Sequence, residues 1–258
     1  CKQNAYYIED RSFSLPELKI LIDAVQAASF ITDKKSDELI QKIAALGGSH
    51  QAEVLTGNIV HFNTRKHTNE QIYINVNALE NAIRNGQKVA FQYFDLDEKL
   101  RKAYRKEGEV YTAEPVALVF NNDNYYLMTY DTTADNDIRN YRVDRMDNVQ
   151  ALDEKICKGA KSKRKTSPKY TAQVFRMYGG RVEKVELMFE KKLIGAVYDK
   201  FGERTKIKKA GDKYQTTVEV QISPTFWSWI ATFKGSMKIA EPQEIAEEYM
   251  TWVEELKI

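Results

Sequence analysis

The sequence predicts an α+β protein in three parts: an N-terminal helical region, a small curved antiparallel β-barrel and a C-terminal βαββαβ domain. Three observations predict this class. Apolar residues recur at helical spacing within residues 14–46 and 77–85, aromatic-rich strands separated by polar turns follow up to residue 147, and strands alternate with helices after residue 170. The expected boundaries enclose residues 1–70, 71–153 and 170–258, with a basic linker over residues 154–169.

The N-terminal region predicts two helices. In the first, Ser14 is the expected N-cap and Pro16 lies in the first turn. Its apolar residues share one face: Leu18, Leu21, Ile22, Val25 and Ala28. The second helix is expected from about Ser36 to Leu46, and Gly47-Gly48 ends it. The pair is either a helical packing element or a connector and dimerisation hairpin, and the residues alone favour neither.

The central part predicts a curved barrel. A helix over residues 77–85 leads into a strand, KVAFQYF, and a charged loop follows over residues 95–109. The Asn121 to Asn124 turn contains residue types that tolerate a left-handed backbone, so it predicts a hairpin. The three strands of the expected meander are Val110 to Phe120, Tyr125 to Tyr130 and Ile138 to Asp144. A barrel of this kind closes its edges and keeps one strand face or loop rim for binding.

The stretch from Lys155 to Lys169 is basic and contains no carboxylate. We expect a solvated tether between domains, and the functional alternative is an arm whose lysines contact phosphates. Behind it a short helix is expected over residues 170–178. The next six elements give the order βαββαβ, a ferredoxin-like unit: a strand over 182–190, a helix over 193–201, strands over 204–208 and 214–222, a helix from Ser223-Pro224 and a strand over 237–240. A helix over 242–256 completes the chain.

The meander resembles a known family. NYYLMTYD followed by IRNYRVDRM is similar to the core signature of the WYL domain, an aromatic-Tyr-Leu strand followed by I-R-x-aromatic-R-x-D-R. Tyr125 stands where the family usually has Trp, which keeps an aromatic ring and loses the indole donor. The second block agrees in register at Ile138, Arg139, Tyr141, Arg142, Asp144 and Arg145. The resemblance implies an SH3/Sm-like barrel for residues 71–153.

The flanking regions extend the resemblance. The segment AYYIEDRSFSLPELKILIDAVQAASFI resembles the region that follows a winged helix-turn-helix in WYL-type transcription regulators, and the C-terminal part resembles their C-terminal extension, called WCX. The chain begins with Cys1 and not Met, so we expect a fragment whose helix-turn-helix is absent here. A lipidated N-terminal cysteine is the alternative interpretation.

Three arginines are the main candidates for binding. Arg139, Arg142 and Arg145 each carry a planar fork of donors suited to phosphate. Strand alternation places Arg142 opposite its neighbours, so the three need not share one surface. From the residues alone, a solvated ion-pair network with Asp144 is the favoured explanation. The resemblance implies instead a site for a negatively charged ligand, a nucleotide or short nucleic acid, and it implies the ligand-binding set Arg139, Arg142, Arg145, Tyr93, Tyr125, Tyr126, Tyr141 and Asp144.

Of the tyrosines in that set, Tyr93, Tyr125 and Tyr126 offer aromatic faces for stacking bases, although each alone is more typical of core packing. A metal site is not expected: the only histidines are His50, His61 and His67, and the aspartates at 95 and 97 or at 131, 135 and 137 do not continue into a calcium loop. No cofactor is expected either. No phosphate loop, nucleophile elbow or cysteine–histidine pair is present, so we expect no enzyme.

The composition sets the remaining bounds. A net charge of +2 does not by itself indicate nucleic-acid or membrane binding, and no apolar run approaches the ~20 residues of a membrane helix. The two cysteines, far apart, indicate a reducing cytoplasm.

The resemblance implies that the chain is the sensor portion of a bacterial transcription regulator. A nucleotide or short nucleic acid binds the WYL barrel and controls the binding of operator DNA by the missing helix-turn-helix. The regulator is expected to be a homodimer. The alternative is a stand-alone nucleic-acid-binding or partner-binding accessory module, and an upstream region without a helix-turn-helix would favour it. An enzyme acting on nucleic acid is the third hypothesis.

Overall fold

The computed structural model describes residues 13–48, 52, 55, 66, 69–173, 175 and 177–256. The chain forms two compact units, which meet in sequence between Ile74 and Asn75. The predicted α+β class is confirmed. Among the described residues, no helix has the length and apolar character that crossing a membrane requires.

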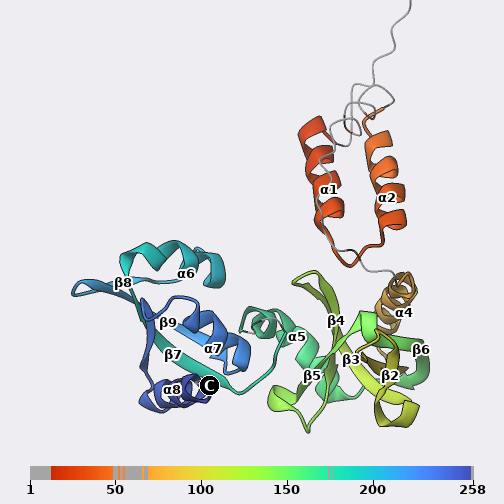
Figure 1. Cartoon of the computed structure of the whole chain (residues 1–258). Coiled ribbons are helices and arrows are strands. Elements are labelled where there is room, and N and C mark those ends of the chain that lie inside the picture. Colours follow the sequence, from red (N-terminus) through yellow and green to blue (C-terminus); the bar gives the residue numbers. More distant parts are fainter. Residues whose placement is uncertain are drawn as a thin grey trace, which may run out of the picture. The chain divides into compact units, whose positions relative to one another are not determined.

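The first unit contains the two predicted helices, α1 (Leu15–Ala27) and α2 (Asp33–Ala45), which lie side by side (Figure 1). Ser14 caps α1, and the Glu17 carboxylate accepts a hydrogen bond from the Ser14 amide at 2.7 Å. The second helix begins three residues earlier than expected, because the Thr32 hydroxyl caps it by accepting from the Lys35 amide at 3.2 Å. The buried contact between the helices consists of Leu18, Ile22, Ile40 and Ala44, with Leu55.

The second unit begins with a curled antiparallel half-barrel, entered from α4 (Gln71–Asn85). Its strands are β1 (Gln87–Leu96), β2 (Lys102–Tyr104), β3 (Tyr111–Asn121), β4 (Asn124–Tyr130), β5 (Ile138–Arg142) and β6 (Met146–Lys155). β1 pairs with β2, β3 and β6, while β4 joins β3 to β5. The β1 residue Val89 lies opposite Ala113 on one side and Ala151 on the other. Among the described strands, β5 is therefore an edge strand of the meander.

Two strands of the half-barrel, β2 and β6, are not predicted from the sequence. β2 lies inside the predicted charged loop, and all three of its residues are exposed, so no buried alternation marks it. β6 is mostly polar and only Met146 in it is buried. The third strand of the meander ends at Arg142, two residues earlier than expected, because Val143–Arg145 forms a 3₁₀ turn.

The prediction of a solvated tether over residues 154–169 is wrong. Residues Lys158–Gln173 form a helix, α5, that packs on the half-barrel. Ala160 is fully buried, and the Arg164 guanidinium donates to the Pro115 carbonyl at 3.0 Å. Pro168 lies inside the helix and has no amide hydrogen to donate to the Arg164 carbonyl. The Ser167 hydroxyl donates to that carbonyl instead. Of the helix expected over 170–178, residues 170–173 form the end of α5, whereas Phe175 and Tyr178 form an isolated β-bridge.

The C-terminal domain has the predicted order of elements. They are β7 (Val182–Phe189), α6 (Ile194–Phe201), β8 (Lys208–Ala210), β9 (Lys213–Gln221), α7 (Pro224–Ala231), β10 (Met237–Glu241) and α8 (Gln243–Glu255). The sheet order β10-β7-β9-β8 is antiparallel throughout, which is the ferredoxin-like arrangement. β8 begins at Lys208, where the predicted 204–208 strand ends, because it pairs with β9 directly across the Gly211 turn. The buried core includes Val185, Leu187, Phe189, Val220, Phe226 and Ile230.

Candidate anion-binding site

An open hollow of about 820 Å³ lies where β4, β5 and the β3–β4 turn meet the segment 177–179. Four arginines line it: Arg105, Arg139, Arg142 and Arg145. Three asparagine amides, at Asn122, Asn124 and Asn140, share its wall with them. None of the described residues that line the hollow is Asp or Glu, so its inner surface is rich in donors and positively charged.

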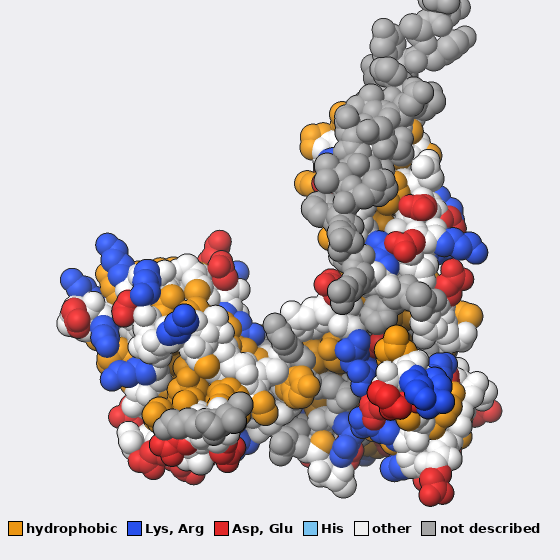
Figure 2. All heavy atoms as spheres, viewed as in Figure 1, with side chains coloured by type: hydrophobic (Ala, Val, Ile, Leu, Met, Phe, Trp, Pro, Cys, Tyr) orange, Lys and Arg blue, Asp and Glu red, His pale blue; other side chains and the backbone are white. Residues whose placement is uncertain are grey.

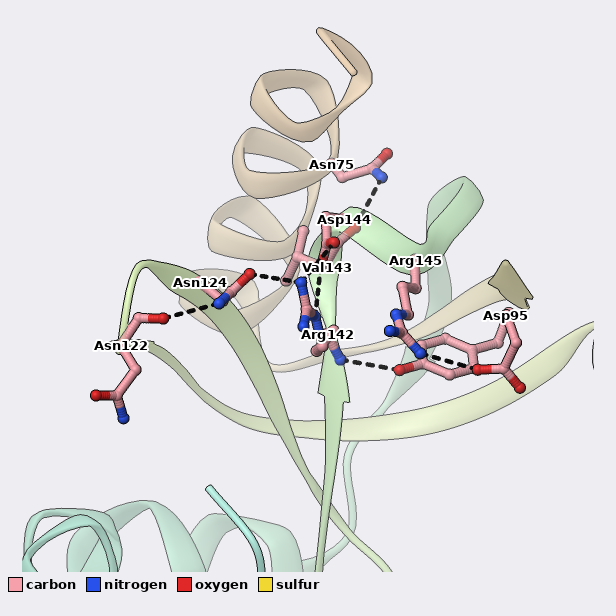
Figure 3. A network of polar contacts seen from close by, with 9 residues as sticks. Asn75, Asp95, Asn122, Asn124, Arg142, Val143, Asp144 and Arg145 are labelled. Atoms are coloured by element: carbon pink, nitrogen blue, oxygen red, sulfur yellow. Dashed lines mark hydrogen bonds and ion pairs between the residues drawn. The ribbon is translucent and has the colours of Figure 1, made fainter. Parts of the chain in front are cut away.

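Arg142 is held by two neighbouring side chains, Asp144 and Asn124 (Figure 3). Its Nε and Nη2 donate to the two carboxylate oxygens of Asp144 at 3.0 and 2.9 Å, and Nη2 also donates to Asn124 Oδ1 at 2.6 Å. The Arg142 backbone amide donates to the Tyr93 hydroxyl at 3.2 Å. Among the described residues, none of these contacts uses Nη1, so two of its N–H groups are available to a ligand in the hollow.

Arg105 and Arg145 share one carboxylate. Asp95 Oδ2 accepts from Arg105 Nε at 2.6 Å, and Asp95 Oδ1 accepts from Arg105 Nη2 at 3.0 Å and from Arg145 Nη1 at 2.9 Å. The Arg105 hydrogen bonds, followed by the Arg145 charge, hold the pKa of Asp95 below its usual value. The Arg105 guanidinium also lies 5.2 Å from the centre of the Tyr93 ring, a cation–π contact.

Arg139 is held from the β4–β5 loop. Its Nε donates to Asp131 Oδ2 at 2.6 Å. Hydrogen bonds from Thr133, supported by Arg139, lower the pKa of Asp131 to about 2. Arg139 and Arg142 have opposite strand parity, yet both line the hollow, because β5 is an edge strand and the cavity extends around it. The three predicted arginines thus meet at one site.

A buried amide fixes the 3₁₀ turn that carries Asp144 and Arg145. The Asn75 side chain is 1% exposed, and its Nδ2 donates to the Met146 carbonyl at 2.8 Å and to the Val143 carbonyl at 3.4 Å (Figure 3). Val143 itself is fully buried. The turn is therefore anchored from α4 on one side and from the core on the other.

The predicted aromatic residues separate into two groups. Tyr93 and Tyr126 line the hollow, and burial raises the pKa of both hydroxyls. Tyr141 packs edge-on against Tyr93 and Phe91 with both ring centres 5.2 Å away, and burial raises its pKa to about 12. Tyr125 packs against Phe120 at 5.2 Å. Tyr141 and Tyr125 do not line the hollow, while Asp144 lies behind it as the partner of Arg142.

Residues 75–151 match the family model described as WYL domain. The chain contains a WYL domain. The matched residues include α4 from Asn75 onward and all the strands of the half-barrel up to the middle of β6. The four arginines and all three aspartates that bind them fall inside the WYL domain, whereas segment 177–179 of the hollow lies outside it.

Two solved structures are similar to the chain over most of its length. Proteasome accessory factor B/C (PafBC) of Arthrobacter aurescens is 18% identical with a TM-score of 0.33, and the match covers 94% of this chain and 36% of that one. A protein described as CRISPR Cas-related is 12% identical with a TM-score of 0.43, with 96% and 74% covered. The chain thus spans about a third of the length of the PafBC chain. No curated protein sequence matches it.

Sequence reasoning missed several residues of the site. Arg105 lies in the charged loop, in no recognisable motif, so no sequence signal marks it. The two residues after it, Lys106 and Glu107, have a left-handed backbone. Asn122 and Asn124 are predicted as turn formers, and their second role in the wall has no separate sequence signal. Asn140 donates to the Met177 carbonyl and to the Tyr170 hydroxyl, both at 2.9 Å, so it links the WYL domain to the segment that follows α5.

The part of the chain that the structure describes contains no group of three or more His, Cys, Asp or Glu residues able to hold a metal ion. Asp95 and Asp131 bind arginines, and Asp97 accepts from the Arg101 side chain and backbone. The three histidines lie outside the described residues.

Proposed function

We propose that this chain is the ligand-sensing regulatory portion of a bacterial transcription regulator, and that its WYL domain binds a nucleotide or a short single-stranded nucleic acid. One observation carries the proposal: four guanidinium groups line one hollow whose described wall has no carboxylate. Guanidinium groups bind phosphate oxygens through paired donors and remain charged at every physiological pH. A small carboxylate ligand would need one such group, whereas four suit a ligand with several anionic oxygens.

The rest of the wall favours a nucleotide over inorganic phosphate. The Asn122 and Asn124 amide nitrogens each donate one hydrogen bond within the β3–β4 turn, and the second N–H of each amide matches acceptors on the edges of bases. Tyr126 presents an aromatic ring in the same wall, and rings of this kind stack on bases with little sequence preference. The Tyr93 hydroxyl accepts the Arg142 amide, so its own proton is available to a phosphate oxygen.

The arginines are held in place before a ligand arrives. Asp95, Asp131 and Asp144 lie behind them and fix the four guanidinium groups in the wall. A ligand therefore meets an ordered site and orders few side chains on binding. We propose binding and not catalysis as its role, and incubation of labelled oligonucleotides with the chain, with and without Mg²⁺, tests this by the appearance of cleaved product.

Regulation requires that the ligand favour one arrangement of the whole protein over another. We propose that a DNA-binding domain outside this chain, within a homodimer, responds to the ligand. The same hollow also suits an accessory module that regulates another machine. Operator affinity of the longer protein, measured with and without ligand, separates the two, because only a transcription regulator changes that affinity.

Fluorescence anisotropy of labelled decathymidylate and decauridylate across a salt series tests the site. Arg142→Ala is expected to weaken binding about tenfold or more, because it removes a charged hydrogen-bond donor from the hollow. Arg101→Ala is the matched control: Arg101 also pairs with an aspartate of the WYL domain but lies outside the hollow. Equal affinity of the Arg142→Ala variant and the wild type would refute the proposed site.

A further inference from the structure

A second hollow adjoins the first. It has a volume of about 400 Å³ and lies between the β3–β4 turn and the C-terminal domain. Asn121 and Asn122 line it from the turn, Lys200 from α6, and Trp229 from α7. Asn122 lines both hollows. The tip of the β3–β4 turn therefore lies at the border of both hollows.

Lys200 supplies the charge of the second hollow. Its ammonium lies 3.7 Å from the centre of the Phe175 ring, and burial lowers its pKa. None of the described residues in the wall is Asp or Glu. An ammonium that is partly removed from water and faces a cavity without carboxylates in its wall interacts strongly with an incoming anion.

α7 presents a matching face to the same hollow. Thr225, Ser228, Trp229 and Thr232 are spaced by three and four residues, so they lie along one side of α7 and its C-terminal end, and all four line the hollow. The Ser228 and Thr232 hydroxyls donate to helix carbonyls at 2.8 and 2.9 Å, which leaves their oxygens as acceptors. Trp229 is held edge-on by Phe201 and Phe233 at 5.5 and 5.1 Å, so its indole is a fixed, partly exposed aromatic surface.

Charge is unevenly distributed over the C-terminal domain, with basic residues concentrated around Lys200 and acidic residues on α8. Residues 191–213, which include α6 and β8, contain eight basic and three acidic residues. Residues 243–255, which form α8, contain five glutamates and no basic residue. Figure 2 shows mostly blue side chains over α6 and β8 and red ones around α8. An anionic chain is therefore attracted to the side of the domain that carries Lys200 and repelled from α8.

We propose that the second hollow is a subsite for the same ligand, which makes the ligand a single-stranded oligonucleotide and not a mononucleotide. One phosphate lies among the arginines, the backbone passes Asn122, and a following phosphate lies at Lys200 with its base against Trp229. The inference rests on the proposed function of the arginine hollow. It assigns the C-terminal domain a direct part in binding, with its contact restricted to ligands long enough to span both hollows.

Two labelled probes test the subsite, dithymidylate and decathymidylate, by anisotropy across a salt series. Lys200→Gln is expected to weaken decathymidylate binding several-fold and to reduce the slope of log K against log salt by about 0.7, the value for one phosphate contact on a single strand. Dithymidylate binding is expected to stay unchanged. Trp229→Phe, which keeps an aromatic ring of smaller area, is expected to weaken decathymidylate binding with the slope unchanged.

Lys209→Gln is the matched control, because Lys209 is an exposed lysine of the same domain and does not line the hollow. Circular dichroism melting of each variant shows whether the fold is kept. If Arg142→Ala weakens both probes while Lys200→Gln changes neither the affinity nor the slope for decathymidylate, the subsite is refuted and the arginine site stands. If Arg142→Ala changes neither probe, the proposed function itself is refuted.

Discussion

At the scale of single residues, the geometry of Arg142 distinguishes a charge requirement from a shape requirement. Its guanidinium lines the hollow, contacts Asp144 through two nitrogens and Asn124 through one, and uses Nη1 in none of these contacts. A lysine ammonium has three donors at a single point and cannot span these partners and a ligand together. The site therefore depends on the fork and not only on the positive charge.

The variant Arg142→Lys tests this dependence. Oligonucleotide affinity is expected to fall about tenfold although the charge is kept, because the ammonium either stays with Asp144 or turns to the ligand. Arg101→Lys, outside the hollow, is the control in the same anisotropy measurement. Full affinity of Arg142→Lys would show that the hollow requires charge alone.

Asp131 makes part of the stability dependent on pH. Its pKa in the folded protein is about 2, below the ~3.9 of an unfolded chain. A lowered pKa stabilises the folded state above the unfolded value, and this contribution is lost as pH falls through the folded value. Asp131→Asn is expected to reduce the free energy of unfolding by about 1 kcal/mol at pH 7. The difference from wild type should shrink between pH 4 and pH 2 in urea titrations, and a constant difference would contradict this assignment.

At the scale of elements, the 3₁₀ turn Val143–Arg145 depends on one amide from α4. Asn75 is buried and satisfies two backbone carbonyls, so its removal leaves both without that donor. Asn75→Ala is expected to reduce the free energy of unfolding by about 2 kcal/mol. Asn77→Ala, a change of the same type at an exposed position of α4, serves as the control in denaturant unfolding. Similar losses in the two variants would show that the turn does not rely on Asn75.

The packing of α5 on the half-barrel predicts that the substitutions Gly159→Ala and Tyr130→Ala have non-additive effects on the free energy of unfolding. A Cβ at Gly159 would lie 2.5 Å from the Tyr130 ring. The helix can therefore pack this close to β4 only because residue 159 has no side chain. Gly159→Ala normally adds about 1 kcal/mol of helix stability. We expect this gain to be absent in the wild-type background and to appear in the Tyr130→Ala background, where the ring is gone. Equal effects in both backgrounds, measured by urea unfolding, would mean that the ring does not limit the approach.

At the scale of the whole molecule, the sequence predicts the elements with strong periodicity. The capped α1, the hairpin at Asn121–Asn124 and the βαββαβ order all follow from local patterns. β2, β6 and α5 do not, because their stability comes from partners distant in sequence: β6 on β1, and the basic α5 on β3 and β4.

The candidate site divides in the same way. Arg139, Arg142 and Arg145 lie in one motif and are predicted, whereas Arg105 reaches the site only because the β2 region folds back to place it near Asp95. Tyr141 and Tyr125 have the residue type of a stacking platform, but their strand positions place them against other aromatic rings. Residue type predicts what a side chain can bind, and the tertiary fold decides whether it reaches the ligand.

The two adjoining hollows predict a joint response of two domains. Addition of decathymidylate is expected to slow hydrogen exchange of backbone amides in β4 and β5 and also in α6 and α7, because one ligand spans both. The α8 helix, which lines neither hollow, is the internal control. Protection confined to β4 and β5 would contradict a shared ligand and agree with a ligand bound to the arginine hollow alone.

The carboxylate of Asp95 has a consequence for how the site exchanges partners. It accepts from both Arg105 and Arg145, so four guanidinium groups are balanced by three aspartates. If either arginine donates to a bound phosphate, the other still neutralises Asp95. In the proposed site, binding of an anion would therefore leave no aspartate without an arginine partner, which lowers the electrostatic cost of exchanging a protein ion pair for a ligand contact.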